Sequence, residues 1–365
     1  MHTDIFIVGG GPAGLAAAIA ACQRGFKVTV ADGWRPPIDK PCGEGLMPDA
    51  LAALAKLGIT VPAEESHPFR GIQFVSEGVS VDASFPKGVG IGIRRTALHR
   101  LMIARAEAVG ASLLWQTPVT GMHSDGIRVS RETVRARWVI GADGRNSLVR
   151  RWTGLERGWQ RKRFAFRQHF RVSPWNDCME VHWGAESQVY VTPVRVGEIC
   201  IAVASREPHM RLDKALEEFP EIASRLRNAE SSSRERGAIS STCELRNVHR
   251  GRVALIGDAS GSVDCITGEG LGLAFRQAEL LAECLARDDL RAYKQQHAVL
   301  ARRPTFMSRL LLALDASPSL RGRAMRAFNT EPQLFRRMVA MHVGALSSVD
   351  SATNVLALGW RMLNA

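Results

Sequence analysis

A glycine-rich segment near the start of the chain has the residue spacing that binds phosphate groups. Gly9 and Gly11 stand where the chain must turn tightly and bring its backbone close to an anion, and Gly14 lets the next helix pack on the preceding strand. The N-terminal N–H groups of that helix and the positive end of its dipole would face a pyrophosphate. Asp32 follows Gly14 by 18 residues, where its carboxylate can accept from ribose hydroxyls and would repel a 2′-phosphate. The segment therefore predicts a bound dinucleotide without a 2′-phosphate.

Four other residues have side chains that could do chemistry at predicted strand ends and helix starts. Arg95 opens a helix, Asp143 ends a late strand, and Asp258 begins a glycine-rich turn that runs to Gly270. Cys42 lies in a loop rich in proline and glycine, where its thiol could take part in proton transfer. The other interpretations stay open: Arg95 as a surface residue, Asp143 as a turn residue, Asp258 as a helix cap and Cys42 as a small buried hydrophobe.

The elements that must position these residues alternate between strands and helices. Buried strands are expected at 4–8 and 26–31, with an Ala-rich helix at 15–23 between them. Further helices are expected at 49–57, 94–109, 212–227 and 270–287, and from 302 onward. Further strands are expected within 70–85, at 112–116, in a hairpin over 126–136, and from 138. Strands are also expected at 164–172, 179–183, 188–191 and 198–204, and from 252.

Composition excludes several classes of protein. No run of eighteen apolar residues occurs and no secretory signal opens the chain, so we expect a cytoplasmic protein. Seven cysteines without paired spacing indicate neither a disulfide framework nor a zinc site. The net charge of +12 comes mainly from scattered Arg, and no nucleic-acid-binding motif accompanies it, so no nucleic-acid partner is expected. Such a charge would instead attract an acidic or membrane-presented substrate.

The order of these motifs along the chain resembles that of the FAD-dependent oxidoreductases with the para-hydroxybenzoate hydroxylase fold. The closest likeness is to the branch that contains the geranylgeranyl reductases and related flavin monooxygenases. This resemblance implies an α/β fold: a Rossmann-type FAD-binding domain interleaved with an antiparallel-sheet substrate domain, followed by a helical C-terminal region. The implied boundaries are 1–65, 91–158 and 246–300 for the FAD-binding domain, 66–90 and 159–245 for the substrate domain, and 301–365 for the helical region.

The resemblance also assigns roles to residues of this chain. Cys42, Cys265 and Glu269 are the catalytic candidates, and Cys265 stands where relatives usually have proline. No metal is expected. The residues expected to bind FAD are Gly9, Gly11, Pro12, Ala13, Gly14, Asp32, Gly33, Cys42, Gly43, Arg95, Asp143, Asp258, Gly268, Gly270 and Leu271.

Two reactions fit this resemblance. We expect a monooxygenase that hydroxylates an aromatic or lipid-like molecule through a C4a-hydroperoxyflavin, since Tyr190-Val-Thr-Pro193 lacks the aromatic residues that follow the tyrosine in polyprenyl reductases. The alternative is a C=C reductase similar to the geranylgeranyl reductases, with Cys42 as a proton donor. No second Gly-x-Gly-x-x-Gly occurs, so NAD(P)H would visit only transiently as the electron donor.

The C-terminal region is strongly basic. It carries nine Arg from Arg302 to Arg361 against Asp315, Glu331 and Asp350. An ordinary solvated helical face explains this, and so does a basic amphipathic surface that rests on anionic lipid and receives a hydrophobic substrate.

Overall fold

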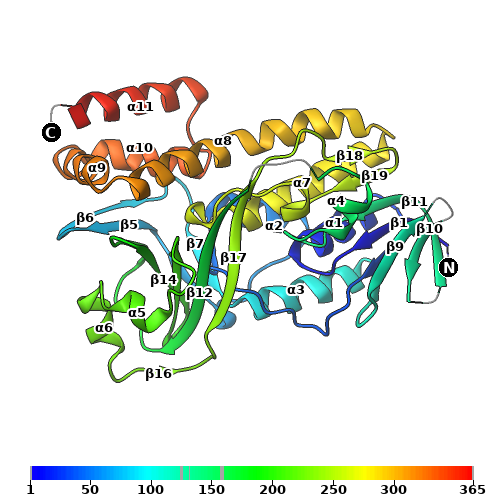
Figure 1. Cartoon of the computed structure of the whole chain (residues 1–365), viewed down its shortest axis with the longest axis horizontal. Coiled ribbons are helices and arrows are strands. Elements are labelled where there is room, and N and C mark those ends of the chain that lie inside the picture. The colour runs from blue at the N-terminus through cyan, green and yellow to red at the C-terminus, as the bar shows by residue number, and fades with distance from the viewer. Residues whose placement is uncertain (1, 124–125, 131, 157–159, 364–365) are drawn as a thin grey trace.

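Two large sheets and a layer of C-terminal helices make up the chain. The computed structural model describes residues 2–123, 126–130, 132–156 and 160–363, and Figure 1 shows the arrangement of its elements. A mostly parallel sheet lies at the N-terminal end of the molecule and a mostly antiparallel sheet lies beside it. The expected α/β fold, with an antiparallel second sheet and a helical C-terminal region, is confirmed.

The N-terminal sheet is built around its first strand. Its order is β18-β19-β11-β1-β2-β8, and β1 pairs in parallel with β11 on one side and with β2 on the other. The hairpin of β9 and β10 extends β11 in the antiparallel direction. The strands are β1 (His2–Val8), β2 (Val28–Ala31), β8 (Ser112–Leu114), β9 (Val119–His123), β10 (Gly126–Val129), β11 (Glu132–Gly141), β18 (His249–Arg250) and β19 (Val253–Leu255).

Helices cover this sheet because their inward faces are almost entirely apolar. The Ala-rich helix α1 contacts α3 and α7, and α2 packs on α7, so that strand and helix residues form one core. Alanine on α1 lets α7 approach it closely while favouring the helical state. The helices are α1 (Pro12–Cys22), α2 (Pro48–Lys56), α3 (Arg95–Ala108), α4 (Leu148–Trp152) and α7 (Gly270–Ala286).

The second sheet has the order β16-β12-β15-β14-β13-β5-β6, with β17 paired to β12. All its pairs are antiparallel except β13 with β5, so strands from 71–84 join strands from 160–243. The expected domain boundary at 158–159 lies outside the described residues. The strands are β5 (Gly71–Ser76), β6 (Val79–Ser84), β12 (Gln160–Arg171), β13 (Cys178–Trp183), β14 (Ser187–Arg195), β15 (Glu198–Ser205), β16 (Glu230–Ser231) and β17 (Arg236–Cys243).

Two features of this region differ from the sequence prediction. The helix predicted over 212–227 is two helices, α5 (Leu212–Leu216) and α6 (Pro220–Leu226). Pro220 lacks an N–H and forces Phe219 out of the helical region, to φ −129° and ψ 70°, so that the chain must start a new helix. Strand β17 was not predicted, because its small, mostly exposed residues give no alternating apolar pattern.

A small third sheet also escaped prediction. It has the order β3-β7-β4, and a short 3₁₀ turn, η1 (Ala63–Glu65), leads directly into β4. Its strands are β3 (Gly45–Leu46), β4 (Ser66–Phe69) and β7 (Gly90–Ile93). Gly92 allows this sheet to lie against β14, because a Cβ atom at this position would stand 1.8 Å from the carbonyl oxygen of Pro193.

The C-terminal helices pack on the second sheet and complete its core. Helices α9 and α10 contact β6, and α11 lies outermost on α9 and α10 (Figure 1). Phe335 is fully buried, with its ring 5.1 Å from that of Phe74 and 5.2 Å from that of Phe328. Within the described residues, no helix is long and apolar enough to cross a bilayer. These helices are α8 (Leu290–Ala316), α9 (Pro318–Thr330), α10 (Pro332–His342) and α11 (Ser348–Leu363).

Phe335→Ala should therefore destabilise the whole protein, because it leaves a cavity between α10 and the sheet. We expect a loss of about 3–5 kcal/mol in the free energy of unfolding, measured by urea denaturation. The matched control is Phe306→Ala on α8, whose ring is 43% exposed and whose loss should change stability by no more than about 0.5 kcal/mol. Equal effects of the two changes would show that the C-terminal helices do not share the core.

Candidate active site

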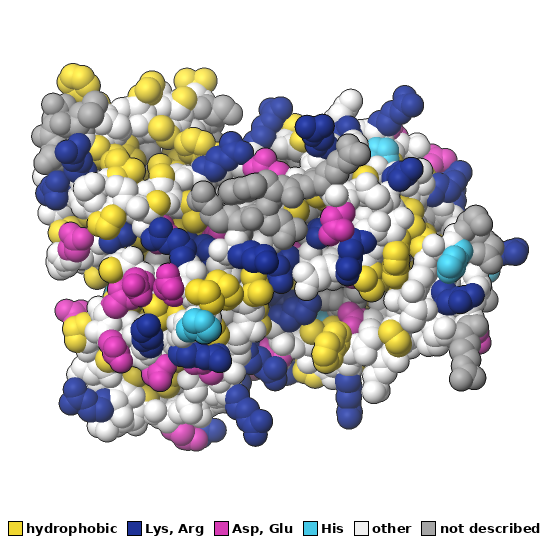
Figure 2. Space-filling view, viewed as in Figure 1, with side chains coloured by type: hydrophobic (Ala, Val, Ile, Leu, Met, Phe, Trp, Pro, Cys, Tyr) yellow, Lys and Arg dark blue, Asp and Glu magenta, His cyan; other side chains and the backbone are white. Residues whose placement is uncertain are grey.

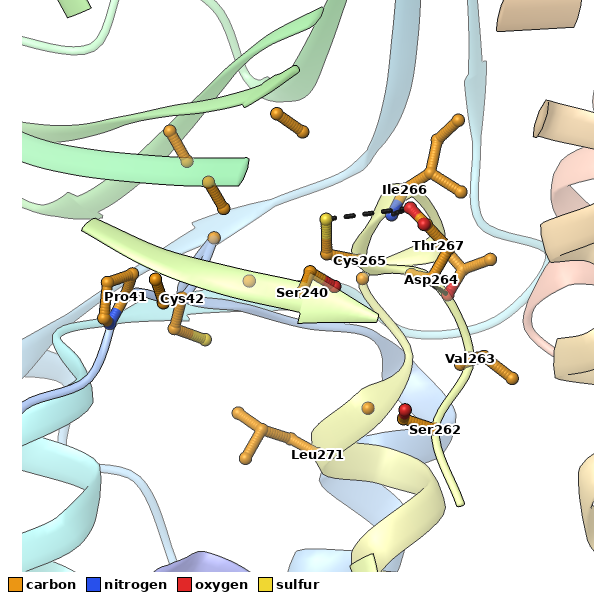
Figure 3. A pocket seen from close by; sticks show the side chains of 18 of the residues that line it. Pro41, Cys42, Ser240, Ser262, Val263, Asp264, Cys265, Ile266, Thr267 and Leu271 are labelled. Atoms are coloured by element: carbon orange, nitrogen blue, oxygen red, sulfur yellow. Dashed lines mark hydrogen bonds between the residues drawn. The ribbon is translucent and has the colours of Figure 1, made fainter. Parts of the chain in front are cut away.

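A cavity of about 670 Å³ between the two large sheets collects most of the residues that the sequence singled out. Figure 3 shows one part of it, where Cys42, Ser240, Cys265 and Leu271 approach from separate segments. Gly9, Gly14, Asp32, Gly33 and Glu269 are not part of its lining. The predicted residues that line the cavity are Gly11, Pro12, Ala13, Cys42, Gly43, Arg95, Asp143, Asp258, Cys265, Gly268, Gly270 and Leu271.

The glycine segment after β1 adopts the predicted tight turn. Gly9 has φ +109°, and a Cβ atom on Gly14 would stand 1.9 Å from the carbonyl oxygen of Gly9, so both positions require glycine. Helix α1 begins at Pro12 without a side-chain cap, which leaves its N-terminal N–H groups available to an anion. The Asp32 carboxylate accepts from the backbone N–H of Gly10 at 2.7 Å and so holds the turn against the end of β2.

His99 supports the same turn and was not predicted from the sequence. Its Nδ1 accepts from the Ile38 backbone N–H at 3.2 Å, so its Nε2 carries the proton and donates to the Gly10 carbonyl oxygen at 2.8 Å. Burial lowers the pKa of His99, which keeps the ring in this neutral form. No local pattern identifies this role, because His99 meets the turn only in the folded chain.

Basic side chains surround the part of the cavity next to this turn. Lys40, Arg95 and Arg145 line it together with Asp258. Although Asp258 faces the cavity, the surrounding protein raises the pKa of its carboxyl by desolvation, and these cations oppose that shift. The buried Nε of Arg95 forms no hydrogen bond. A guanidinium with an unpaired Nε beside the uncapped start of α1 fits the pyrophosphate of the expected dinucleotide. Lys40 and Arg145 were not among the residues predicted from the sequence to bind it.

Asp143 has a clear local role. Its carboxylate accepts from Ser147 Oγ and from the Leu148 N–H, each at 2.6 Å, and from the Val149 N–H at 3.2 Å. These bonds satisfy the free N–H groups at the start of α4. The turn interpretation of Asp143 thus describes its hydrogen bonds, while its position on the cavity lining keeps the cofactor-binding prediction open.

The turn from Gly257 to Gly270 forms the floor of the cavity. Gly268 has the left-handed φ of +65°, and a Cβ atom on Gly270 would meet no atom within 4 Å, so the turn leaves open space above it. Within it, η2 (Gly257–Ser260) and η3 (Cys265–Thr267) are short 3₁₀ segments. The Cys265 Sγ lies 3.7 Å from Asp264 Oδ1 (Figure 3), and burial raises its pKa to about 12, so it remains a thiol at neutral pH.

A buried charge network ties this floor to the second sheet. Arg163 of β12 lies 3.5 Å from Asp264 of the turn and 3.6 Å from Asp315 of α8, all three with little exposure. Gln188 accepts from Arg163 at 3.4 Å and from Tyr190 at 3.0 Å. Removing one charge from such a network leaves the other uncompensated, so it fixes the turn relative to the sheet and α8.

The loop that carries Cys42 is held by Glu44. Glu44 is buried, has φ +61°, and accepts from His169 Nε2 at 2.6 Å and from the Arg95 N–H at 2.9 Å. Its own N–H donates to the Cys42 Sγ at 3.4 Å. Burial raises the pKa of Cys42 and the nearby Arg95 opposes this rise, so Cys42 carries its proton at neutral pH. The predicted thiol therefore faces the cavity from a fixed loop.

Glu44, His169 and Cys200 also have metal-ligand spacing, since their ligand atoms lie within 4.8 Å of one another. Their arrangement is better explained by hydrogen bonds. His169 Nε2 already donates to Glu44, and the Arg167 guanidinium lies 3.1 Å from His169 Nδ1, where it would repel a cation. We interpret the group as a hydrogen-bonded support for the Cys42 loop.

The part of the cavity beyond the Gly257–Gly270 turn has a mainly apolar wall. Its wall combines side chains from the second sheet with side chains from the C-terminal helices, and several are methionines, whose flexible thioethers adapt to a ligand's shape. The sequence analysis missed this contribution of the C-terminal region, because a helical pattern does not show which surface it covers. The apolar lining comprises Met47, Ile72, Phe74, Met179, Val181, Ala202, Ala204, Ile266, Met307, Leu311, Met338 and Val339.

His297 of α8 supports the Asp258 turn from behind. Gln277 accepts from the Gly257 N–H at 2.9 Å with its oxygen, so its amide nitrogen donates to His297 Nε2, also at 2.9 Å. Ser260 Oγ lies 2.9 Å from the same Nε2. An imidazole that accepts in a buried site must be neutral, and burial lowers the pKa of His297 to about 4.

Comparison with known proteins identifies relatives over most of the chain. A family model described as an FAD binding domain matches residues 2–291. The chain is 30% identical over 317 residues to the menaquinone reductase of Mycobacterium tuberculosis, which covers 79% of this chain and 77% of the relative. It is 28% identical over 295 residues to digeranylgeranylglycerophospholipid reductase 1 of Methanothermobacter thermautotrophicus, covering 74% and 73%. A solved flavoprotein/dehydrogenase from Cytophaga hutchinsonii shares the fold over all of both chains, with a TM-score of 0.84 and 18% identity.

The depressed pKa of His297 predicts a loss of stability in acid. Below about pH 6.5 the imidazole of His297 binds a proton in the unfolded chain but not in the folded chain. The free energy of unfolding therefore decreases as the pH is lowered, by about 3 kcal/mol near pH 4. His297→Gln should flatten this dependence in urea unfolding measured between pH 7 and pH 5. The exposed His209 supplies the control, His209→Gln, whose profile should follow that of the unmodified protein. Parallel profiles for all three proteins would exclude a buried neutral His297.

Proposed function

Because this chain belongs to the FAD binding domain family and is an FAD-dependent oxidoreductase of the para-hydroxybenzoate hydroxylase fold, we propose that it reduces a carbon–carbon double bond in an isoprenoid lipid. The observation that carries the proposal is the lining of the cavity, which changes from basic at the glycine turn to apolar beyond the Gly257–Gly270 turn. A cofactor pyrophosphate suits the first part and a hydrocarbon chain suits the second.

The apolar part favours a long, flexible hydrocarbon. Met47, Met179, Met307 and Met338 supply adaptable surface on this wall. The names of the two relatives describe a reductase of a quinone and a reductase of a geranylgeranyl lipid. Both observations support reduction over the hydroxylation expected from the missing aromatic residues after Tyr190.

Each group of residues has a proposed task. The uncapped start of α1 binds the FAD pyrophosphate together with Lys40, Arg95 and Arg145, and Asp258 accepts from the ribitol. The open space above Gly268 and Gly270 admits a planar ring against the start of α7. When bound and reduced, FAD supplies the two electrons of the reaction. The proton must come from a group on the cavity wall, for which Cys42 is the candidate predicted from the sequence.

Hydroxylation of a lipid-like or aromatic molecule is the second candidate. It is favoured by the same apolar wall, since activated oxygen must be protected from water until it reacts. In either reaction we propose NAD(P)H as the donor, visiting transiently.

We further propose that the protein contacts an anionic bilayer through the outer face of α11. Val349 and Leu356 are each 75% exposed and Trp360 is 68% exposed. Figure 2 shows hydrophobic side chains along the edge formed by α11. The exposed positions 349, 352, 353, 356, 359 and 360 form a stripe without charge on α11, flanked by the exposed Asp350 and Arg361, and tryptophan favours the membrane interface. Exposed arginines on α8, α9 and α10 suit anionic lipid: Arg302, Arg323, Arg326, Arg336 and Arg337.

The reaction is tested with NADPH and geranylgeraniol as the probe substrate. We expect the yellow holoenzyme to convert it without oxygen into a product that has gained hydrogen. The same assay under ¹⁸O₂ separates the two candidates, because a hydroxylase would leave ¹⁸O in the product and stop in its absence. Arg95→Gln should weaken FAD binding about tenfold, since a charge-assisted hydrogen bond contributes about 1.5–3 kcal/mol.

Membrane contact is tested by flotation with vesicles of phosphatidylglycerol and phosphatidylcholine. We expect the protein to float with these vesicles and Leu356→Glu to bind them at least about tenfold more weakly, because burial of one leucine contributes about 1.5–3 kcal/mol. Val196→Glu is the control, since Val196 is more exposed than Leu356 but lies on the turn between β14 and β15. The proposal would be contradicted by protein that remains in the bottom fractions of the gradient, or by protein that dimerises through α11 instead.

A further inference from the structure

One wall of the apolar cavity contains an imidazole. His342 is the last residue of α10 and follows Met338 by one helical turn, so both face the cavity. Its ring is 6% exposed, and its Nδ1 forms no hydrogen bond. It is the only histidine of the described residues that lines the cavity. A buried polar ring in an apolar wall is costly to leave unsatisfied and requires an explanation.

Glu269 stands directly behind this ring. Its Oε2 lies 3.6 Å from His342 Nδ1, and neither of its buried carboxylate oxygens has a hydrogen-bond partner. Nδ1 faces Glu269, so Nε2 is the ring nitrogen left for the cavity that His342 lines. The carboxylate of Glu269 and the C-terminal end of α10 are therefore placed to orient the ring through its Nδ1 edge.

Charged groups from three other elements hold Glu269 in place. Arg303 of α8 lies 3.2 Å from Glu269 Oε1 and 2.7 Å from Asp49 Oδ2 of α2. The same Asp49 oxygen lies 2.7 Å from Arg276 of α7. Burial raises the pKa of Glu269, while His342 and Arg303 act in the opposite direction. The sequence analysis named Glu269 as catalytic, yet Glu269 does not line the cavity, so any part it plays in the reaction passes through His342.

We propose that His342 is the acid that protonates the substrate and that Glu269 is its positioning residue. This inference rests on the proposed reduction of a double bond. One alkene carbon receives a hydride from the reduced cofactor, and the π electron pair forms the second C–H bond with the Nε2 proton of imidazolium His342. The ring is left neutral, with its remaining proton on Nδ1 facing Glu269, and it regains the Nε2 proton from water.

His342 suits this task better than Cys42 for an electrostatic reason. Proton loss from an imidazolium leaves a neutral ring, whereas proton loss from Cys42 would create a thiolate beside the Glu44 carboxylate, inside a site whose burial already disfavours that charge. Cys42 then shapes the cofactor end of the cavity, and the proton enters from the opposite, C-terminal wall.

The experiment compares His342→Ala, His342→Gln and Glu269→Gln in the holoenzyme, with His209→Gln as the control and geranylgeraniol as the probe. We expect His342→Ala to retain FAD and to be reduced by NADPH at the normal rate, but to form product at least about 100-fold more slowly. Added imidazole should restore part of that rate by entering the vacated space. His342→Gln should be equally slow without rescue, Glu269→Gln should lower kcat more than it changes KM, and His209→Gln should match the unmodified protein.

A second measurement tests the contact between His342 and Glu269, called the dyad below, without substrate turnover. In the ¹⁵N-histidine spectrum of the oxidised holoenzyme, the His342 signals are those lost in His342→Gln, and we expect Glu269→Gln to shift them. Product formation by His342→Ala within twofold of normal would overturn the proposal, as would a slow variant that imidazole does not rescue. If the unmodified enzyme reduces no isoprenoid, the proposed function fails instead, and the response of the His342 signals to Glu269→Gln still decides whether the dyad exists.

Discussion

The close approach of α1 to the turn after β1 is the contact on which the cavity depends. Only glycine fits at position 14, because any side chain there would strike the Gly9 carbonyl oxygen. That contact aims the free N–H groups of α1 at the basic part of the cavity, and Asp32 and His99 lock the same turn from two other elements. The rest of the chain encloses the space that this contact creates.

The enclosure has opposite chemistry at its two ends. Lys40, Arg95 and Arg145 lie at one end, and the hydrocarbon wall from the second sheet and the C-terminal helices lies at the other. The buried network of Arg163, Asp264 and Asp315 joins the sheet, the Gly257–Gly270 turn and α8. Each of these buried charges would be costly without its partners, so the network fixes the second sheet, the Gly257–Gly270 turn and α8 relative to one another. The boundary between the basic end and the apolar end of the cavity is fixed with them.

The sequence was informative where the chemistry is local. The spacing of Gly9, Gly11, Gly14 and Asp32 predicts a turn whose parts are near one another in the chain, and the structure places them as expected. Lys40, His99 and His169 escaped prediction because each acts across a distance in sequence that no periodic pattern records. The pair of Glu269 and His342 spans 73 residues and becomes visible only when α10 packs on the sheet. The break at Pro220 was readable in principle, since proline seldom continues a helix.

The wall supplied by α8 and α10 has an evolutionary consequence. The lining residues of these two helices, Met307, Leu311, Met338, Val339 and His342, all follow residue 291, where the match to the FAD binding domain ends. Substitutions in that final stretch of the gene can therefore alter one side of the apolar wall while the glycine turn and its basic surroundings stay unchanged.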